Sequence, residues 1–340
     1  MKLGDVSVSY IGILLKATAS LGLDVKPILQ QFNLNDRVLS SPDARISIPK
    51  FMRLGHACIE QAQAPWLGLE MGKVTSPSNL GLAGLIALSA PSLKQAFQQL
   101  TWYEPLSSYN TRGQSSFYYQ GKQAIAQFYS ISPYNEYNFF VVDSVLSGWY
   151  RLCHRLTGQG HGIERVCFEF PAPAYQHKYD QYFACEVLFE QDFNGLVFKA
   201  EALNWPCLDH CQTTFYLLKR QANSELDKLR LGQSFSERVS RAISPLLSGG
   251  TPTLEQVAEQ LNTPPWTVRR KLVADGTSFQ QTLNKTRREL AVSYICDTQL
   301  SLGEIAYLLG FASPAAFQHA FKRWLGVAPG QYRVFSQQKT

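Results

Sequence analysis

A set of polar and basic residues recurs at short intervals near the carboxyl end of the chain: Gln318, His319, Lys322 and Arg323. The residues between them are apolar and fall at positions i, i+3, i+4 and i+7: Phe317, Ala320, Phe321 and Trp324. This spacing predicts a helix that buries the apolar set and presents the polar set to its surroundings. Amide, imidazole and cationic groups on an outward helix face can hydrogen-bond to base edges and phosphates, so the pattern indicates DNA binding.

A second, shorter helix must precede this one. Ser301 and Glu304 are spaced as a capping box, which predicts a helix start at residue 301. Gly310 can take a positive φ and end that helix, and Ser313 followed by Pro314 can start the next. A short helix, a tight turn and a helix with an outward polar face form a helix-turn-helix, expected over about residues 301–325.

The same pattern occurs once more upstream, over about residues 253–274. Thr253 and Gln256 form another candidate capping box. Val257, Ala258 and Leu261 match Ile305, Ala306 and Leu309 at an offset of 48 residues, and Val268 and Leu272 match Phe317 and Phe321 at an offset of 49. Residues 263–266 open its second helix, and residues 278–295 are expected to form a helix that connects the two copies. The chain therefore contains an internal repeat of two helix-turn-helix units.

The charge of the protein is concentrated in this region. From residue 237 onward there are twelve Lys and Arg against seven Asp and Glu, a net charge of +5, whereas the whole chain carries +6. A basic segment attached to a nearly neutral remainder is typical of a protein that binds a polyanion through one domain.

Length and composition bound the rest. A chain of 340 residues predicts about two domains. Seven Cys without regular spacing favour free thiols in a reducing compartment. We find no signal peptide and no membrane-spanning stretch, so we expect a cytoplasmic protein that does not contact a membrane.

The N-terminal part mixes both periodicities. Residues 1–100 read as helical, and residues 115–120 and 124–129 predict a hairpin around Gly121. Residues 137–156 predict a buried helix. Asn194-Gly195 predicts a turn between strands at 187–189 and 196–198. The expected fold class is multidomain: an α+β N-terminal domain over residues 1–231, then an all-α domain over residues 232–340 with two helix-turn-helix motifs and a connecting helix.

Residues 236–335 resemble the DNA-binding domain of AraC/XylS-type transcription regulators. The residues that carry the resemblance are Gly303-Glu-Ile-Ala306, Leu309-Gly-Phe-Ala-Ser313, Phe317, Ala320-Phe-Lys-Arg-Trp324, Gly326-Val and Pro329-Gly-Gln-Tyr-Arg333. The N-terminal part is similar to the effector-binding, arabinose-binding-type domain found in a subset of that family. That similarity rests on Asp43-Ala-Arg-Ile46, Gly81-Leu-Ala-Gly84, Ser89-Ala-Pro-Ser-Leu93, Phe168-Glu-Phe-Pro-Ala-Pro173 and Leu196-Val-Phe198.

The resemblance implies that each recognition helix enters one of two successive major grooves. Carried over by position, the first would use Trp266, Thr267, Arg269 and Arg270. The second would use Ala315, Gln318, His319 and Lys322. Because Pro314 and Ala315 are short, we expect the second helix to read fewer base edges and to rely more on phosphates. A solvated helix face is the alternative for these residues, and a structural role with backbone or Glu partners is the alternative for Arg287 and Arg288.

The resemblance also implies a small-molecule effector. The aromatic-rich N-terminal region offers Tyr103, Phe117 and Tyr119 as residues that could line an apolar pocket, with Arg112 as a partner for an anion. Packing in the core, or a surface position for Arg112, is the alternative. A helix over residues 213–229 could support a homodimer through Phe215, Leu218, Ala222 and Leu226, or pack within its own domain.

Three functions remain open at the sequence level. The leading hypothesis is a DNA-binding regulator that senses a small molecule, with RNA polymerase as a partner if it activates transcription. The second is a regulator that needs no ligand and whose N-terminal domain only mediates dimerisation or protein contacts. The third is an enzyme fused to a DNA-binding module, but we find no phosphate loop, nucleophile elbow or acid–base pair. We expect no catalytic residues and no cofactor. Cys207, His210 and Cys211 lack further ligands at suitable spacing, so we expect no metal.

Overall fold

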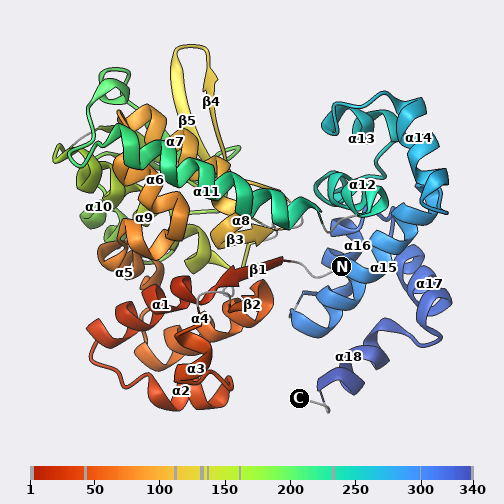
Figure 1. Cartoon of the computed structure of the whole chain (residues 1–340). Coiled ribbons are helices and arrows are strands. Elements are labelled where there is room, and N and C mark those ends of the chain that lie inside the picture. Colours follow the sequence, from red (N-terminus) through yellow and green to blue (C-terminus); the bar gives the residue numbers. More distant parts are fainter. Residues whose placement is uncertain are drawn as a thin grey trace. The chain divides into compact units, whose positions relative to one another are not determined.

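The computed structural model describes residues 4–41, 44–110, 113–130, 134–135, 138–160, 162–231, 234–298 and 300–337 (Figure 1). The chain forms two compact units, one containing residues 5–109 and 114–227 and the other consisting mainly of the residues from 228 onward. Within the described ranges, no helix is both long and apolar enough to cross a membrane.

The N-terminal unit contains helices and two small sheets. Its α-helices are α1 (Val8–Ser20), α2 (Lys26–Gln31), α3 (Asp36–Leu39), α4 (Ile48–Ala62), α5 (Leu67–Val74), α6 (Gly81–Ser89), α7 (Leu93–Trp102), α8 (Glu104–Ser107), α9 (Phe139–Thr157), α10 (His177–Tyr182) and α11 (Gln212–Leu231). Two 3-10 helices, η1 (Pro77–Leu80) and η2 (Glu201–Asn204), complete the helical part. The expected helix over residues 137–156 corresponds to α9, although Tyr137 itself lies outside the described residues.

The strands are β1 (Gly4–Ser7), β2 (Arg45–Ser47), β3 (Ser108–Asn110), β4 (Ser116–Gln120), β5 (Gln123–Phe128), β6 (Ile163–Cys167), β7 (Glu186–Leu188) and β8 (Asn194–Phe198). One sheet has the order β2-β1-β3 and the other β4-β5-β8-β6-β7. In the larger sheet β6 and β7 are parallel, and the other neighbours are antiparallel. The predicted hairpin is confirmed as β4 and β5, with Gly121 at a φ of +60° in the turn.

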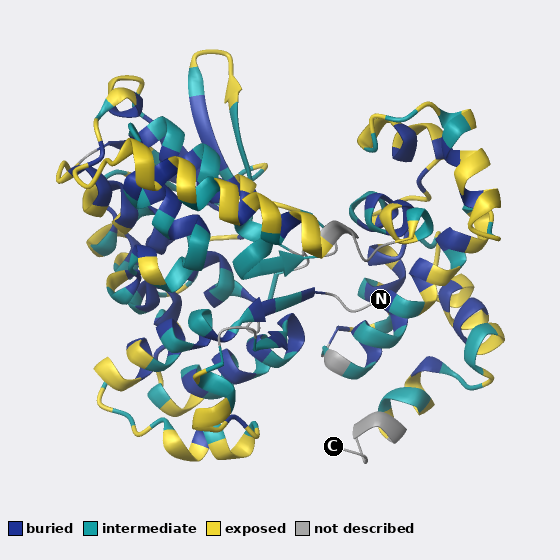
Figure 2. Ribbon diagram, in the orientation of Figure 1, coloured by how far each residue is buried: buried dark blue, intermediate teal, exposed yellow. Residues whose placement is uncertain are grey.

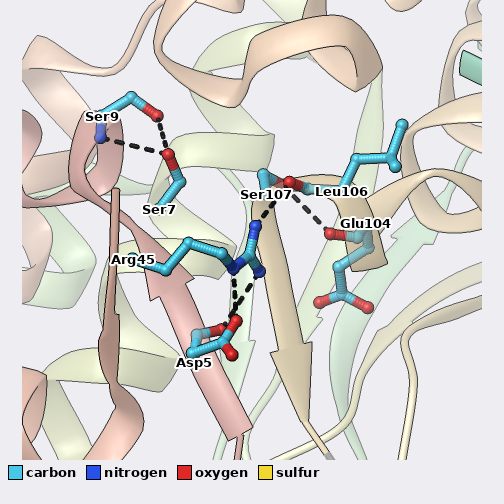
Figure 3. Close-up of polar contacts among 7 residues, drawn as sticks. All are labelled: Asp5, Ser7, Ser9, Arg45, Glu104, Leu106 and Ser107. Atoms are coloured by element: carbon cyan, nitrogen blue, oxygen red, sulfur yellow. Dashed lines mark hydrogen bonds and ion pairs between the residues drawn. The ribbon is translucent and has the colours of Figure 1, made fainter. Parts of the chain in front are cut away.

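The purely helical prediction for residues 1–100 is wrong at β1 and β2. These strands are short, and they form because Val6 and Ile46 pair across them and bury their side chains. Arg45 joins them to a third segment: its Nε donates to the Asp5 carboxylate and its Nη1 donates to the Leu106 carbonyl at 2.8 Å (Figure 3). Pairing between segments about 40 residues apart has no local signature in the sequence.

Helices α5 and α9 approach each other closely because small residues line their contact. A Cβ added at Gly68 would lie 2.4 Å from the Asp143 Cβ, and one added at Gly72 would lie 2.2 Å from the Ser147 Oγ. The Ser147 hydroxyl also donates to the Gly68 carbonyl at 3.1 Å. Glycine at these two positions therefore permits a helix contact that any side chain would prevent.

The turn predicted at Asn194-Gly195 is also wrong, because both residues belong to β8. Asn194 is fully buried; its Oδ1 accepts from the Glu169 backbone N–H at 3.0 Å and its Nδ2 donates to the Tyr134 hydroxyl at 2.5 Å. Gly195 lies where a Cβ would be 2.6 Å from the Ala126 carbonyl oxygen of the neighbouring strand. This Asn-Gly pair serves a buried polar network and close strand pairing, not a change of chain direction.

In the C-terminal unit, the described residues from 234 onward form helices joined by turns and contain no strand. Its elements are α12 (Phe235–Ile243), η3 (Ser244–Leu247), α13 (Leu254–Gln260), α14 (Pro265–Ala274), α15 (Phe279–Asp297), α16 (Leu302–Leu308), α17 (Pro314–Leu325) and α18 (Pro329–Gln337). α13 with α14 and α16 with α17 are the two helix-turn-helix units, and α15 connects them (Figure 1).

The capping signals predicted from the sequence are present in both helix-turn-helix motifs. At Ser301 and Thr253 the side chain accepts from the backbone N–H three residues on, and the side chain of that residue accepts in return. Ser313 accepts from the Ala316 N–H at 3.2 Å, with Pro314 in the first turn of α17. Because caps depend on a few adjacent residues, the sequence alone predicts them.

Candidate nucleic-acid interface

The outward face of α14 is basic and aromatic. Val268 and Leu272 are fully buried, which turns Trp266, Arg269 and Arg270 away from the core. Trp266 is 64% exposed, and the Arg270 guanidinium carbon lies 5.3 Å from the centre of its indole ring. This stacking limits the freedom of both side chains and leaves the Arg270 donors in a restricted position. The fourth expected residue, Thr267, is half-buried at the edge of this face.

The outward face of α17 holds the second set of expected residues. Ala315, Gln318, His319 and Lys322 are all exposed. Phe317 and Phe321 are fully buried on the opposite side, whereas Trp324 is only half-buried. Figure 2 shows both recognition helices with exposed residues along one side and buried residues along the other.

The repeat also points to a residue that the sequence prediction does not include. At the offset of 49, Trp266, Arg269 and Arg270 correspond to Ala315, Gln318 and His319, and Lys322 corresponds to Val273. Val273 is 67% exposed, which is unusual for a branched apolar side chain on a basic helix. The sequence does hold a signal for this residue, because the same offset aligns the buried residues of the two helices.

The two turns are built alike from different residues. Gly310 has a φ of +66° and donates its N–H to the Tyr307 carbonyl at 3.0 Å. Asn262, at the equivalent place in the first unit, has a φ of +45° and donates to the Glu259 carbonyl at 2.9 Å. Asn is among the few non-glycine residues that adopt this conformation readily. Both turns therefore end the first helix through the same backbone conformation.

Arg287 has a structural role, as one of the two alternatives predicted. It is buried, and it donates to the Leu309 and Gly310 carbonyls and to the Thr251 hydroxyl at 2.7–2.8 Å. Burial lowers the pKa of its guanidinium. Arg287 thus fixes the turn of the second unit to α15, whereas Arg288 is exposed.

The residues suggested for effector binding do not lie in one environment. Tyr103 is buried and its hydroxyl donates to the Asn223 Oδ1 at 2.7 Å. Phe117 packs against the core beside Phe198, and Tyr119 is about half exposed. Arg112 lies outside the described residues.

Helix α11 packs mainly within its own unit. Phe215, Ala222 and Leu226 are buried in the core of the N-terminal unit, and Leu218 packs against that core. The core role predicted for this stripe is therefore confirmed. Tyr216 and Leu217, on the other side of α11, are more than half exposed.

Of the three residues considered as metal ligands from the sequence, His210 and Cys211 have local partners. The His210 Nδ1 lies 3.0 Å from the Ser89 carbonyl oxygen, and the Thr214 hydroxyl donates to the Cys211 sulfur at 3.2 Å. Across the described ranges, no three His, Cys, Asp or Glu side chains are grouped so that they could hold a metal ion.

Comparison with known proteins gives matches over both units. Residues 22–207 match the family model described as the arabinose-binding domain of AraC transcription regulators, and residues 257–334 match a helix-turn-helix domain. The chain is 30% identical to the ornithine utilization regulator of Pseudomonas aeruginosa over 329 residues, which cover 96% of each protein. It is 26% identical to the transcriptional regulator VirS of Mycobacterium tuberculosis, over 93% of this chain and 92% of VirS. Among solved structures, the regulator CdpR of Pseudomonas aeruginosa aligns over 91% of this chain and 96% of its own, with 18% identity and a TM-score of 0.42.

Proposed function

Since the chain belongs to the AraC family of DNA-binding transcription regulators, we propose that the outward faces of α14 and α17 read two successive segments of its operator. The observation that carries this proposal is the equivalence of the two faces. Each presents four exposed positions, residues 266, 269, 270 and 273 on α14 and residues 315, 318, 319 and 322 on α17, at a common offset.

The chemistry of the two faces differs. Arg269 and Arg270 can each donate two hydrogen bonds to the O6 and N7 atoms of guanine. Trp266 and Val273 offer apolar contact to a thymine methyl group. On α17, Gln318 can pair with adenine, while Lys322 suits a phosphate. The first helix therefore supplies most of the base discrimination and the second supplies more of the positioning.

Replacing Arg269 by Ala tests the base-reading role. We expect operator binding to weaken by about 1–3 kcal/mol and the preference at one base pair to relax, because Ala cannot make the bidentate hydrogen bonds to a base edge. Gel-shift titration against the preferred duplex and its single-base variants measures both. Arg155→Ala, which removes an exposed Arg of α9 in the other unit, should change neither. Unaltered affinity and base preference in Arg269→Ala would refute the assignment.

We further propose that the N-terminal unit binds a small-molecule effector whose binding shifts DNA affinity or dimerisation. The support is the arabinose-binding-type family model and the relative named as an ornithine utilization regulator. Arabinose, ornithine and a panel of metabolites and fatty acids are the probes for a thermal-shift assay, since a ligand of the native state raises the melting temperature. A panel without any shift would favour the ligand-independent alternative.

We also propose that the protein self-associates through its N-terminal unit. If it activates transcription, we propose that it contacts RNA polymerase as well. The exposed Tyr216 and Leu217 of α11 are the candidates for the contact between copies. Light scattering of Leu217→Glu against Thr214→Glu tests this, with a monomer expected only for the former. A reporter gene behind the operator distinguishes activation from repression.

A further inference from the structure

A cluster outside the outward faces of α14 and α17 brings two cations close to one aromatic ring. Phe235 is the first residue of α12. The Lys271 Nζ of α14 lies 5.1 Å from the centre of the Phe235 ring, and the Arg238 guanidinium carbon lies 5.5 Å from it. Both cationic side chains are exposed, and Phe235 is partly buried. The ring attracts each cation and restricts its position.

The backbone next to Phe235 is tied to the end of α14. The Ser236 backbone N–H donates to the Asp275 Oδ2 at 2.8 Å, and Asp275 directly follows the last residue of α14. The beginning of α12 is fixed by a capping box, in which the Ser234 N–H donates to the Glu237 carboxylate at 3.0 Å. The start of α12 and the end of α14 are thereby tied together.

The acidic groups of this region are used by the backbone. Asp275 accepts from Ser236, and Glu237 accepts from Ser234. Among the residues that the structure describes, neither Arg238 nor Lys271 forms an ion pair. Within the described part of the chain, both cations therefore lack a carboxylate at ion-pair distance, and their donors can bind an added anion.

The position of the cluster indicates which anion that is. Lys271 follows Arg270 directly and lies on the side of α14 that faces α12, beside the outward face formed by Trp266, Arg270 and Val273. When a recognition helix occupies a major groove, the sugar-phosphate strands form the walls on its two sides. A neighbouring helix of such a motif commonly meets the backbone there.

We propose that Phe235, Arg238 and Lys271 form a binding site for the DNA phosphate backbone beside the groove that α14 enters. Arg238 can grip a phosphate through two donors, and Lys271 adds a compact charge. Contacts of this kind set the register of the protein on the duplex without reading its sequence. The proposal rests on the entry of α14 into the groove.

The dependence of affinity on salt tests this site, because binding to each phosphate releases counterions. The full-length protein is titrated into a mixed-sequence duplex by fluorescence anisotropy at several salt concentrations, and then into its selected operator. The slope of log K against log salt is negative. For Arg238→Gln and for Lys271→Gln we expect it to become less negative by about 0.9 for each phosphate that is no longer neutralised, and by about twice that in the double variant. The base preference of the operator should stay as in the wild type.

Lys219→Gln is the matched control. The Lys219 Nζ lies 5.1 Å from the Phe215 ring on α11, so the same local interaction is removed from the other unit. Its salt slope should equal that of the wild type. Thermal unfolding of every variant checks that the fold is retained.

An unchanged slope in the folded double variant would overturn the phosphate site. The base-reading proposal would survive that result, because it depends on the change of base preference in Arg269→Ala. A wild-type protein that binds the mixed-sequence duplex but prefers no sequence would instead contradict the base-reading proposal.

Discussion

Arg287 shows how a single buried charge can fix the geometry of a DNA-binding unit. Its guanidinium reaches two carbonyls at the turn between α16 and α17 and a hydroxyl before α13. The planar group also lies 4.8 Å from the centre of the Phe311 ring. Arg287 thereby supplies a donor to the Leu309 carbonyl at the end of α16, whereas the Gly310 carbonyl also accepts from the Thr251 hydroxyl at 3.3 Å.

Replacing Arg287 by Ala should lower the free energy of unfolding of the C-terminal unit by about 1–3 kcal/mol, because buried acceptors lose their donors. Urea unfolding followed by circular dichroism measures this. Arg287→Lys keeps the charge but cannot span the three acceptors with a planar fork, so it should recover only part of the loss. Wild-type stability in Arg287→Ala would contradict the structural role.

At the residue scale, the sequence predicts most of the exposed residues on the outward faces of α14 and α17, but it misses Val273. We can predict the exposure of Arg269, Arg270 and Gln318 because buried neighbours at helical spacing define the opposite side of each helix. Val273 escapes prediction because an apolar residue on a helix is normally assigned to the core. For Arg287, the sequence leaves two roles open, since its partners are carbonyls more than 20 residues away.

At the scale of elements, the turn of the second unit depends on one glycine. A Cβ at Gly310 would lie 1.9 Å from the Gly250 carbonyl oxygen, in addition to requiring a positive φ. Gly326, which ends α17, also has a positive φ of +79°, but a Cβ there would meet no atom within 4 Å. The two positions separate the cost of the backbone conformation from the cost of a steric clash.

Gly326→Ala should therefore reduce the stability of the unit by about 1–2 kcal/mol, the cost of a left-handed conformation. Gly310→Ala should cost clearly more, because the chain near Gly250 must also move. Thermal denaturation of the two variants side by side measures the difference. Equal losses of stability would show that the contact with Gly250 does not constrain this turn.

Elements specified by adjacent residues are predictable from the sequence, and those specified by distant partners are not. The caps at Thr253, Ser301 and Ser313 follow from residues three positions away. Asn194-Gly195 has the local signature of a turn, yet it pairs with β5 and β6 and contacts Glu169. The strands β1 and β2 stabilise each other across about 40 residues, so neither is visible alone.

At the scale of the whole molecule, the N-terminal unit contains two carboxyl groups with a raised pKa, those of Asp143 and Glu104. Asp143 is fully buried; one carboxylate oxygen accepts from the Tyr179 hydroxyl at 2.8 Å and the other has no partner. Burial raises the pKa of this carboxyl to about 8. Burial likewise raises the pKa of Glu104 to about 7, although both its oxygens accept from Ser115.

These shifts predict how stability depends on pH. Between the ordinary pKa of Asp, about 4, and pH 8, the folded state keeps a proton on Asp143 that the unfolded state has released. The free energy of unfolding therefore falls as pH rises through this window, by at most about 1.4 kcal/mol per pH unit for one group, and levels off above it.

Asp143→Asn should remove much of this dependence, because the amide cannot ionise. Denaturation at pH 5 and pH 8 measures the change, and the exposed Asp192→Asn should behave as the wild type does. Glu104 leaves a smaller dependence of the same sign. Identical pH profiles for Asp143→Asn and the wild type would contradict a buried neutral carboxyl.

The central claim is that one chain reads DNA through two equivalent faces of unequal chemistry. Selection of bound duplexes from a random pool, with the wild type, Arg270→Ala and Gln318→Ala, tests it most directly. We predict two blocks of preferred base pairs about one helical turn apart, the stronger relaxed by Arg270→Ala and the weaker by Gln318→Ala. A single block, or preferences that neither variant changes, would contradict the two-face account.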